Sequence, residues 1–280
     1  MNFLPIIQSV QNEWVKSLRK LHDRADRVER RCFLIEGTHA VEEAIATQWP
    51  LVSIVFNTKW AQSHPQLLAQ LASRAVSSQT NLQPVSDDIL RKLSTTNSPC
   101  SVIAVASITD HSFQEDKKQL RSENSSLMIA AESLQDPGNL GTLIRVAAAS
   151  GFGRIVLSDD SVDPTNPKVL RSTAGQWFRS PPIVTDNLRA WIRGRKSEGF
   201  QVLAASAEGQ SMWDCNLTSN TIVLLGNEGS GLSQDLRVEA TGTVSIPMAI
   251  GVESLNVAVS GALIAYEALR QRKSKAASPT

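Results

Sequence analysis

Two loop segments of this chain combine charged or polar side chains with residues that let the backbone turn. In residues 132–145 (ESLQDPGNLGTLIR), Asn139 stands where a helix is expected to open, and Arg145 follows nearly two turns later. In residues 224–233 (LLGNEGSGLS), three glycines surround Glu228. A guanidinium can stabilise a developing oxyanion or hold a phosphate, and a carboxylate can accept a proton. Taken alone, the same residues also fit a helix capped by Asn139, an exposed arginine and a helix-capping carboxylate.

A third segment, IPMAIGVESLNVAVSGALIAYEAL, ends a predicted strand at Pro247–Met248 and begins a predicted helix near Ser254 and Asn256. These polar residues could be no more than an ordinary helix start. The helix is expected to run to about Lys273, with Ala, Val, Gly and Leu on most of its faces. Such a helix is typically buried by more than one neighbour, and a second subunit is one way to provide a neighbour.

Several common active sites are disfavoured by the motifs. The glycine loop lacks the GxxxxGK[ST] order of a phosphate-binding loop, and no GxGxxG follows the first strand of either half. No GxSxG elbow appears and no histidine lies near the glycine loops, so a hydrolase has little support. The scattered cysteines and histidines favour neither a disulfide framework nor a metal site. These residues are Cys32, Cys100, Cys215, His22, His39, His64 and His111.

The loops need a scaffold, and the apolar pattern of the C-terminal half predicts one. The runs SLMIAAES, RIVLSD, QVLAASA, TIVLLG and TVSIPM lack polar alternation, as strands of a parallel sheet covered on both faces do. Helical patterns separate several of these runs. Residues 127–280 are therefore predicted to form a doubly wound α/β domain, in which ligands bind beyond the carboxyl ends of the strands.

The N-terminal half predicts a smaller domain. The runs FLIEG, LVSIVFN and SVIAVAS are expected strands, and THAVEEAIATQ and QLLAQLASRAVSS are helical patterns between them. This alternation predicts an α/β/α domain over residues 1–107. Residues 108–126 are polar without an apolar period and are predicted to be a linker.

Composition limits the class of protein. With 280 residues, 41% hydrophobic and 20% charged, the chain has room for two globular domains. No run approaches the roughly 18 apolar residues of a membrane helix, and the N-terminus does not resemble a secretory signal, so a cytoplasmic location is expected. The net charge is only +1, so binding of nucleic acid would need local basic patches.

The densest basic patch lies in residues 11–31, where four acidic residues accompany seven basic ones. It could simply be a solvated helix face. A second group follows the second predicted strand of the C-terminal domain and comprises Lys168, Arg171 and Arg179. The basic residues of the first patch are Lys16, Arg19, Lys20, Arg24, Arg27, Arg30 and Arg31.

In this order and at this spacing, NLGTLIR, GNEGSGLS and IPMAIGVESLNVAVS resemble the three signature motifs of the SpoU/TrmH RNA ribose methyltransferases. The resemblance covers essentially the whole C-terminal half, and DPTNPKVLRSTAGQWF is similar to the segment between the first two motifs. QNEWVKSLRKLHDRADRVERRCFLIEG resembles the substrate-binding domain that many members carry, which is similar in fold to ribosomal proteins that bind kinked RNA. One departure is Glu13–Trp14, where relatives tend to have Asn-Pro.

This resemblance implies transfer of a methyl group from S-adenosylmethionine to a ribose 2′-hydroxyl of structured RNA, in a homodimer whose active site uses both subunits. It also implies a C-terminal trefoil knot, which no periodicity argument could have supplied. Backbone groups around Ala205, Gly226, Ile246 and Leu255 would hold the cofactor. The catalytic and RNA-positioning residues carried over from the motifs are Asn139, Arg145, Glu228, Ser254 and Asn256.

The family proposal makes Arg145 the base, but a guanidinium with a pKa above about 12 is not normally deprotonated in proteins. We therefore expect Arg145 to clamp the developing oxyanion and a neighbouring phosphate. The proton would go to an RNA phosphate, to water, or to Glu228 if that carboxylate reaches the hydroxyl. RNA backbone contacts are expected from the two basic patches, through Lys16, Arg19, Lys20, Arg24, Lys168 and Arg171.

Two alternatives remain at this point. The extra N-terminal domain favours ribosomal RNA by resemblance, but transfer RNA is the other substrate class. A knotted domain that binds RNA without transferring a methyl group is a further possibility, and the intact set of five catalytic positions argues against it.

Overall fold

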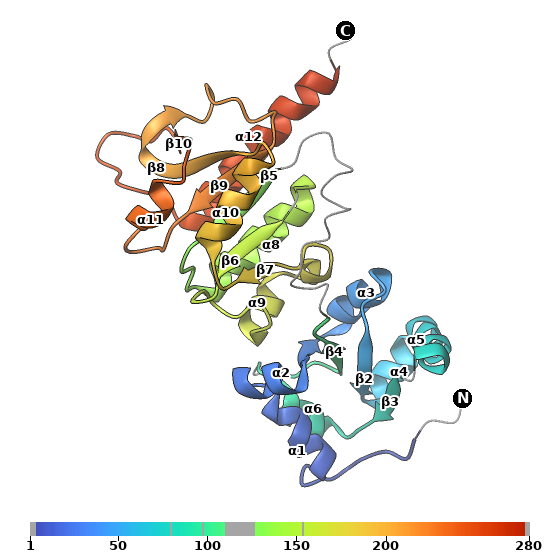
Figure 1. Ribbon diagram of the computed structural model, residues 1–280. Coiled ribbons are helices and arrows are strands. Elements are labelled where there is room, and N and C mark those ends of the chain that lie inside the picture. The colour runs from blue at the N-terminus through green and yellow to red at the C-terminus, as the bar shows by residue number, and fades with distance from the viewer. Residues whose placement is uncertain (1–3, 79, 97, 110–126, 153, 278–280) are drawn as a thin grey trace. The chain divides into compact units, whose positions relative to one another are not determined.

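The computed structural model describes residues 4–78, 80–96, 98–109, 127–152 and 154–277, shown in Figure 1. By their contacts these residues form two compact units. The first unit contains the residues before 110 together with 165–179, and the second contains the remainder. The predicted linker, 108–126, lies almost entirely outside the described residues, and the domain boundaries at 107 and 127 remain predictions.

The first unit is built on a four-stranded mixed sheet with the order β1-β4-β2-β3. Strand β4 is antiparallel to both of its neighbours, whereas β3 is parallel to β2. Strands β1, β2 and β4 match the predicted runs, but β3 was missed because NLQP has no apolar run and is too short for a clear period. The strands are β1 (Cys32–Glu36), β2 (Leu51–Phe56), β3 (Asn81–Pro84) and β4 (Val102–Ser107).

Helices cover this sheet and complete the predicted α/β unit. Apolar residues of α1 (Glu13–Lys20) and α6 (Asp87–Leu93) share one core cluster with residues of β1, β2 and β4. Helix α3 (Thr38–Ala46) packs against β1 and β4. The remaining helices before β4 are α2 (Arg24–Arg30), α4 (Thr58–Ser63) and α5 (Pro65–Ser78).

Residues 165–179 come from the C-terminal half of the sequence but pack with the first unit. They form α9 (Pro167–Ser172) and a 3₁₀ turn, η1 (Gln176–Phe178). Arg179 donates two hydrogen bonds to the carboxylate of Glu43, at 2.6 and 3.2 Å. Four aromatic rings form a cluster with centroids about 5 to 6.5 Å apart, and they belong to Phe33, Trp49, Trp177 and Phe178.

The second unit contains a six-stranded sheet in which every described pairing is parallel, with the order β10-β8-β9-β5-β6-β7. This confirms the predicted parallel α/β fold. The neighbouring strands β5 and β9 are buried along their whole length, as their unbroken apolar sequences indicate. The strands are β5 (Leu127–Ala131), β6 (Ile155–Ser158), β7 (Ile183–Thr185), β8 (Gln201–Ser211), β9 (Thr221–Leu225) and β10 (Gly242–Ser245).

Helices cover both faces of this sheet (Figure 1). Residues of α10 (Leu188–Ser197) and α11 (Gln234–Arg237) share a core cluster with alternate residues of the strands, among them Met128. On the other face, α8 (Pro137–Ser150) and α12 (Val257–Ala277) pack against each other and against the sheet.

The contact between α8 and α12 requires a glycine. A Cβ atom on Gly261 would lie 2.6 Å from a methyl carbon of Leu143 on α8 and 3.2 Å from one of Leu225 on β9. Gly261 therefore lets α12 lie close to α8 and to the carboxyl end of β9. Helix α12 begins at Val257, three residues later than the sequence predicted, and β10 ends at Ser245, before the predicted Pro247–Met248.

Two general features concern the described residues only. None of the helices there is long and apolar enough to span a membrane. No three His, Cys, Asp or Glu residues in these ranges are grouped as metal ligands would be. Cys32 and Cys215 are buried, Cys100 is half-buried, and all three are free thiols.

Candidate active site

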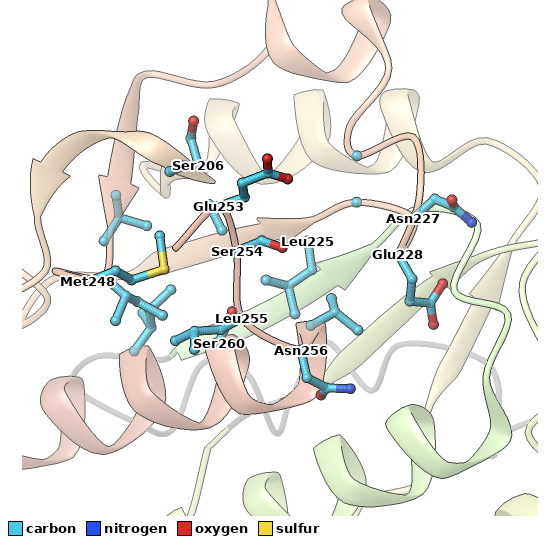
Figure 2. Close-up of a pocket in the computed structure, with 18 of the residues that line it drawn as sticks. Ser206, Leu225, Asn227, Glu228, Met248, Glu253, Ser254, Leu255, Asn256 and Ser260 are labelled. Carbon is cyan, nitrogen blue, oxygen red and sulfur yellow. The ribbon is translucent and has the colours of Figure 1, made fainter. Parts of the chain in front are cut away.

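The loops after β9 and β10, together with residues within β8, line one cavity of about 460 Å³ in the second unit (Figure 2). It lies beyond the carboxyl ends of parallel strands, where α/β sheets bind their ligands. The start of α12 closes one side of it, through Val257, Ser260 and Ile264. The four residues expected to hold a cofactor all line this cavity, and they are Ala205, Gly226, Ile246 and Leu255.

The lining of the cavity combines apolar side chains with negative charge. Its apolar side chains come from both loops and strands, and they include Leu225, Met248 and Ile264. Two carboxylates, those of Glu228 and Glu253, belong to the lining, whereas no described Lys, Arg or His does. A phosphate-bearing ligand would meet repulsion here, and a cation would be attracted.

The glycine loop is held by Asn227, which the sequence analysis did not single out. Its side-chain oxygen accepts hydrogen bonds from the backbone N–H groups of Gly229 and Ser230, at 2.9 and 3.0 Å. Gly226 permits the loop to fold back, because a Cβ there would lie 2.2 Å from the carbonyl carbon of Gly231. The preference of Asn for turns next to glycine is the signal that could have identified Asn227.

Glu228 connects the glycine loop to the loop before α8. Its carboxylate accepts hydrogen bonds from the backbone N–H groups of Gln135 and Asp136, at 3.3 and 3.2 Å, and from Nδ2 of Asn139 at 3.0 Å. Burial alone would raise the pKa of Glu228, but these hydrogen bonds outweigh burial and hold the pKa below its ordinary value of 4.5. Glu228 is therefore an ionised carboxylate whose oxygens already have donors.

Asn139 and Asn256 extend this contact into a chain of hydrogen bonds in which each amide donates toward Glu228. Oδ1 of Asn256 accepts from the backbone N–H groups of Ala258 and Val259 at the start of α12, at 2.9 and 3.2 Å. Its Nδ2 donates to Oδ1 of Asn139 at 2.9 Å, which leaves Nδ2 of Asn139 to donate to Glu228. The first turn of α12, the first turn of α8 and the glycine loop are thus linked through three side chains.

The role predicted for Asn139 as helix cap is wrong. The N-cap of α8 is Asp136, whose Oδ1 accepts from the backbone N–H groups of Gly138 and Asn139, at 2.5 and 3.3 Å. Pro137 occupies the first helical position, where its missing N–H costs nothing. Asn139 consequently lies inside the first turn, and its amide is available for Glu228.

Arg145 and Ser254 complete the predicted set and differ in position. Ser254 lines the cavity, between Glu253 and Leu255. Arg145 is exposed on α8, does not line the cavity and has no hydrogen-bond or ion-pair partner among the described residues. The structure therefore brings four of the five predicted catalytic residues to the cavity or its network, and leaves Arg145 outside.

Comparison with known proteins bears directly on this site. Residues 126–266 match the SpoU rRNA Methylase family, and residues 12–104 match the MRM3-like substrate binding domain. The chain belongs to the SpoU rRNA methylase family. Relatives of this methylase include an uncharacterised tRNA/rRNA methyltransferase of Synechocystis, 38% identical over 95% of this chain and 94% of the relative. The 23S rRNA guanosine 2′-O-methyltransferase RlmP of Bacillus subtilis is 31% identical over 93% of this chain and 97% of its own.

Solved structures give the same assignment. The AdoMet-bound rRNA methyltransferase of Sinorhizobium meliloti is similar with a TM-score of 0.83 and 27% identity, over 95% of this chain and 97% of that one. The SpoU methyltransferase AviRb of Streptomyces viridochromogenes, in complex with AdoMet, is similar with a TM-score of 0.79 and 27% identity, over 94% and 99% of the two chains. The similarity therefore extends over both halves of this methylase.

The basic residues predicted to contact RNA are all at the surface of the first unit, and their role remains a prediction. Lys16, on α1, pairs with Glu13 at 2.7 Å. Arg171 forms an ion pair with Glu36 at 3.8 Å and also hydrogen-bonds Thr95, so it already has a structural contact. The other four, which are exposed and whose side chains have no hydrogen-bond or ion-pair partner among the described residues, are Arg19, Lys20, Arg24 and Lys168.

Arg27, in the same basic patch, is buried instead. Its guanidinium donates to the carbonyl oxygens of Leu21 and His22, at 3.1 and 2.7 Å, and to the hydroxyl of Thr165 at 3.1 Å. Arg27 therefore holds α2 and the start of the 165–179 segment within the first unit and is not available to RNA.

Proposed function

We propose that this SpoU rRNA methylase transfers a methyl group from S-adenosylmethionine to a ribose 2′-hydroxyl of ribosomal RNA. The observation that carries the proposal is the network of Glu228, Asn139 and Asn256 beside a cavity lined by every residue expected to hold the cofactor. Ribosomal RNA is favoured over transfer RNA because RlmP, similar over nearly its whole length, is named a 23S rRNA methyltransferase.

The cavity suits S-adenosylmethionine in size and charge. Its volume of about 460 Å³ lies within the range of small-molecule sites. The apolar side chains suit an adenine ring, and the two carboxylates suit a ligand with net positive charge. Backbone groups around Ala205, Gly226, Ile246 and Leu255 would hold the cofactor, which supplies an electrophilic methyl group on a sulfonium.

The chain's own residues must orient the ribose hydroxyl and stabilise it as its proton leaves. Glu228 is a weak base, because its pKa is lowered and its oxygens accept three hydrogen bonds. We assign Glu228 and Asn139 to holding the two loops in position, and Asn256 to tying them to α12. The guanidinium of Arg145 stabilises the developing oxyanion, and an RNA phosphate or water accepts the proton.

A homodimer would bring Arg145 to the site. Helix α12 and the residues before it expose an apolar stripe at helical spacing, which comprises Leu255, Val259, Leu263 and Tyr266. Arg145 lies on α8, the helix packed against α12. A second copy covering this stripe would place its α8 near the cavity of the first, so that each site receives Arg145 from the partner.

Three further parts of the proposal come from the family. The second and third motif loops, which both line the cavity, are proposed to form a trefoil knot. The first unit is proposed to bind RNA through the exposed cations of α1 and α2, by contacts to the sugar-phosphate backbone. The enzyme is proposed to act in the cytoplasm, where its RNA substrate would be.

Mapping of ribose methylation across total RNA, from cells with and without this gene, tests the proposal. We expect one or a few 2′-O-methyl positions in ribosomal RNA to disappear with the gene and to return with the intact enzyme. If the lost 2′-O-methyl positions were confined to transfer RNA, transfer RNA and not ribosomal RNA would be the substrate. An unchanged map, together with no transfer from radiolabelled S-adenosylmethionine to either RNA in vitro, would overturn the proposal.

A further inference from the structure

We infer that Glu253 makes the cavity bind the positively charged methyl donor more tightly than the product that remains after transfer. This inference rests on the proposed function and deepens it. Sequence analysis did not single out Glu253, which precedes the predicted Ser254 in the third motif. Its carboxylate belongs to the cavity lining, and it is a positioning and selectivity group rather than a participant in the reaction.

The charge of the cavity is the first observation. Glu228 and Glu253 are the ionisable residues of the described lining, and no cation there offsets them. The two carboxylates differ in what they contact. Glu228 accepts two hydrogen bonds from the loop before α8 and one from Asn139 in the first turn of α8, whereas Glu253 is exposed and has no hydrogen-bond or ion-pair partner among the described residues. The carboxylate of this lining without a partner among the described residues is therefore that of Glu253.

The position of Glu253 is the second observation. In the view of Figure 2, Glu228 and Asn256 lie toward one side of the cavity and Met248 toward the other, with Glu253 between them near Ser206. The chain reaches this position through a turn in which the N–H of Val252 donates to the carbonyl of Ala249 at 3.2 Å. Glu253 therefore has its own place in the cavity, separate from the network around Glu228.

The chemistry of the cofactor gives this charge a consequence. In the transfer, the ribose oxygen would form a bond to the methyl carbon, and the electron pair of the broken carbon–sulfur bond would stay on sulfur. The proton of the attacked hydroxyl would pass to an RNA phosphate or water. The sulfonium becomes a neutral thioether, and the rest of the molecule keeps its charges. An unpaired carboxylate attracts the donor and loses that attraction when the product forms, so Glu253 favours exchange of product for fresh donor.

The test compares affinities for S-adenosylmethionine and S-adenosylhomocysteine, measured by titration calorimetry on the full-length protein without RNA. For Glu253→Gln, which keeps shape and removes charge, we expect about five- to tenfold weaker binding of S-adenosylmethionine, the scale of one partly screened charge pair. Binding of S-adenosylhomocysteine should stay within twofold. Glu208→Gln is the matched control, because Glu208 is exposed on β8 next to the lining residue Ala207 but does not line the cavity.

Two further readouts separate this role from a structural one. Raising the salt concentration should reduce the preference for S-adenosylmethionine strongly in the unmodified protein and less in Glu253→Gln, which keeps only the charge of Glu228. Sinefungin, which carries an ammonium in place of the sulfonium methyl, should follow S-adenosylmethionine. Equal weakening of all three ligands, or an unchanged ratio, would overturn the inference. Absence of any binding to the unmodified protein would instead contradict the proposed function.

Discussion

At the scale of single residues, Arg145 is the predicted catalytic residue whose side chain contributes least to the fold. It is exposed on α8 and has no partner within the described residues, so its removal leaves no buried charge behind. We expect Arg145→Ala to lower methyl transfer by roughly a hundredfold or more, the scale of one oxyanion stabiliser. Affinity for S-adenosylmethionine should stay within a few fold, because Arg145 does not line the cavity.

Arg145→Lys separates charge from shape. Lysine keeps the positive charge but loses the planar fork that can hold an alkoxide and a phosphate together, so we expect only slight recovery of transfer over Arg145→Ala. Single-turnover transfer and titration calorimetry are the two measurements. If Arg145→Ala abolished cofactor binding, the residue would belong to the cofactor site and the assigned role would be wrong.

Glu228 gives a prediction about pH. Its pKa is lowered in the folded protein, so the hydrogen bonds that it accepts stabilise the two loops above its ordinary pKa of 4.5 and are lost as the pH falls through the lowered value. We expect the backbone amides of Gln135 and Asp136 to lose protection from hydrogen exchange over that acid range. In Glu228→Gln this pH dependence should be absent, with weaker protection already at neutral pH. Identical protection profiles in the two proteins would contradict the role of Glu228 as the acceptor.

Sequence patterns identified most of the site at residue scale, and the omissions have a common cause. Asn139, Glu228, Ser254 and Asn256 were found through motifs that are contiguous in sequence. Asn227 and Glu253 lie within the same motifs and Asp136 lies just before the first, but their importance depends on which backbone groups or space they face. The helix cap is Asp136, three residues before the predicted Asn139. Pro137 favours this start, because proline is suited to the first position of a helix.

At the scale of elements, the segment 165–179 joins the first unit through aromatic packing. Trp177 is 1% exposed and contacts the rings of Phe33 and Trp49. We expect Trp177→Ala to lower the free energy of unfolding by about 3 to 5 kcal/mol, as truncation of a large buried aromatic residue does. Urea denaturation monitors the loss, and Lys168→Ala, an exposed change in the same segment, should cost less than about 0.5 kcal/mol.

A fragment ending near residue 109 tests the packing of residues 165–179 in a second way. It lacks Trp177, Phe178 and Arg179, and therefore leaves Phe33, Trp49 and Glu43 without these partners. Adding a peptide of residues 165–179 should stabilise this fragment. If the fragment were as stable without the peptide as the first unit is in the whole chain, the packing of this segment would not be what holds it.

Elements with unbroken apolar runs were predictable, and short polar ones were not. Strands β5 and β9 match their predicted segments closely because burial on both faces of a sheet requires such runs. Strand β7 has only three residues, and α10 has the basic sequence LRAWIRGRKS, so neither stands out from a loop in hydrophobicity. Their positions depend on contacts with β6 and β8 that no local pattern encodes.

At the scale of the whole molecule, the sequence predicted two α/β parts but not the grouping of residues 165–179 with the first of them. The apolar residues of that segment fit a helix of either part equally well. The deciding partners, Phe33, Trp49 and Glu43, lie more than a hundred residues earlier in the chain. Contacts of such long range are set by the complete fold. A single domain boundary between 107 and 127 therefore cannot assign residues 165–179 to the first unit.

The homodimer is the prediction that belongs to this scale. The exposed fractions of the stripe residues are 37% for Leu255, 44% for Val259, 38% for Leu263 and 49% for Tyr266. Three apolar side chains in one row on α12, with Leu255 just before the helix, are an unfavourable surface for a single chain in water. An isologous contact with a second copy would cover both rows at once. We therefore expect light scattering at micromolar concentration to give twice the chain mass of 30.4 kDa.

Substitution in the stripe should break this dimer and, with it, the active site. Leu263→Arg places a charge in the middle of the row, and since Leu263 is already partly exposed, the chain should stay folded while its mass falls to that of one chain. Val28→Arg is the matched control, because Val28 is an exposed valine of the first unit, 64% exposed and outside the stripe.

If each site receives Arg145 from the partner, Leu263→Arg should lose methyl transfer as severely as Arg145→Ala does. We expect Asn139→Ala to be inactive as well, because the loops around Glu228 lose their link to α12. A mixture of this variant with Arg145→Ala would then regain part of the activity in mixed dimers, since one of their two sites would contain both native residues. A single-chain mass for the unmodified protein, or no recovery in the mixture while each variant remains dimeric, would show that Arg145 acts within its own subunit.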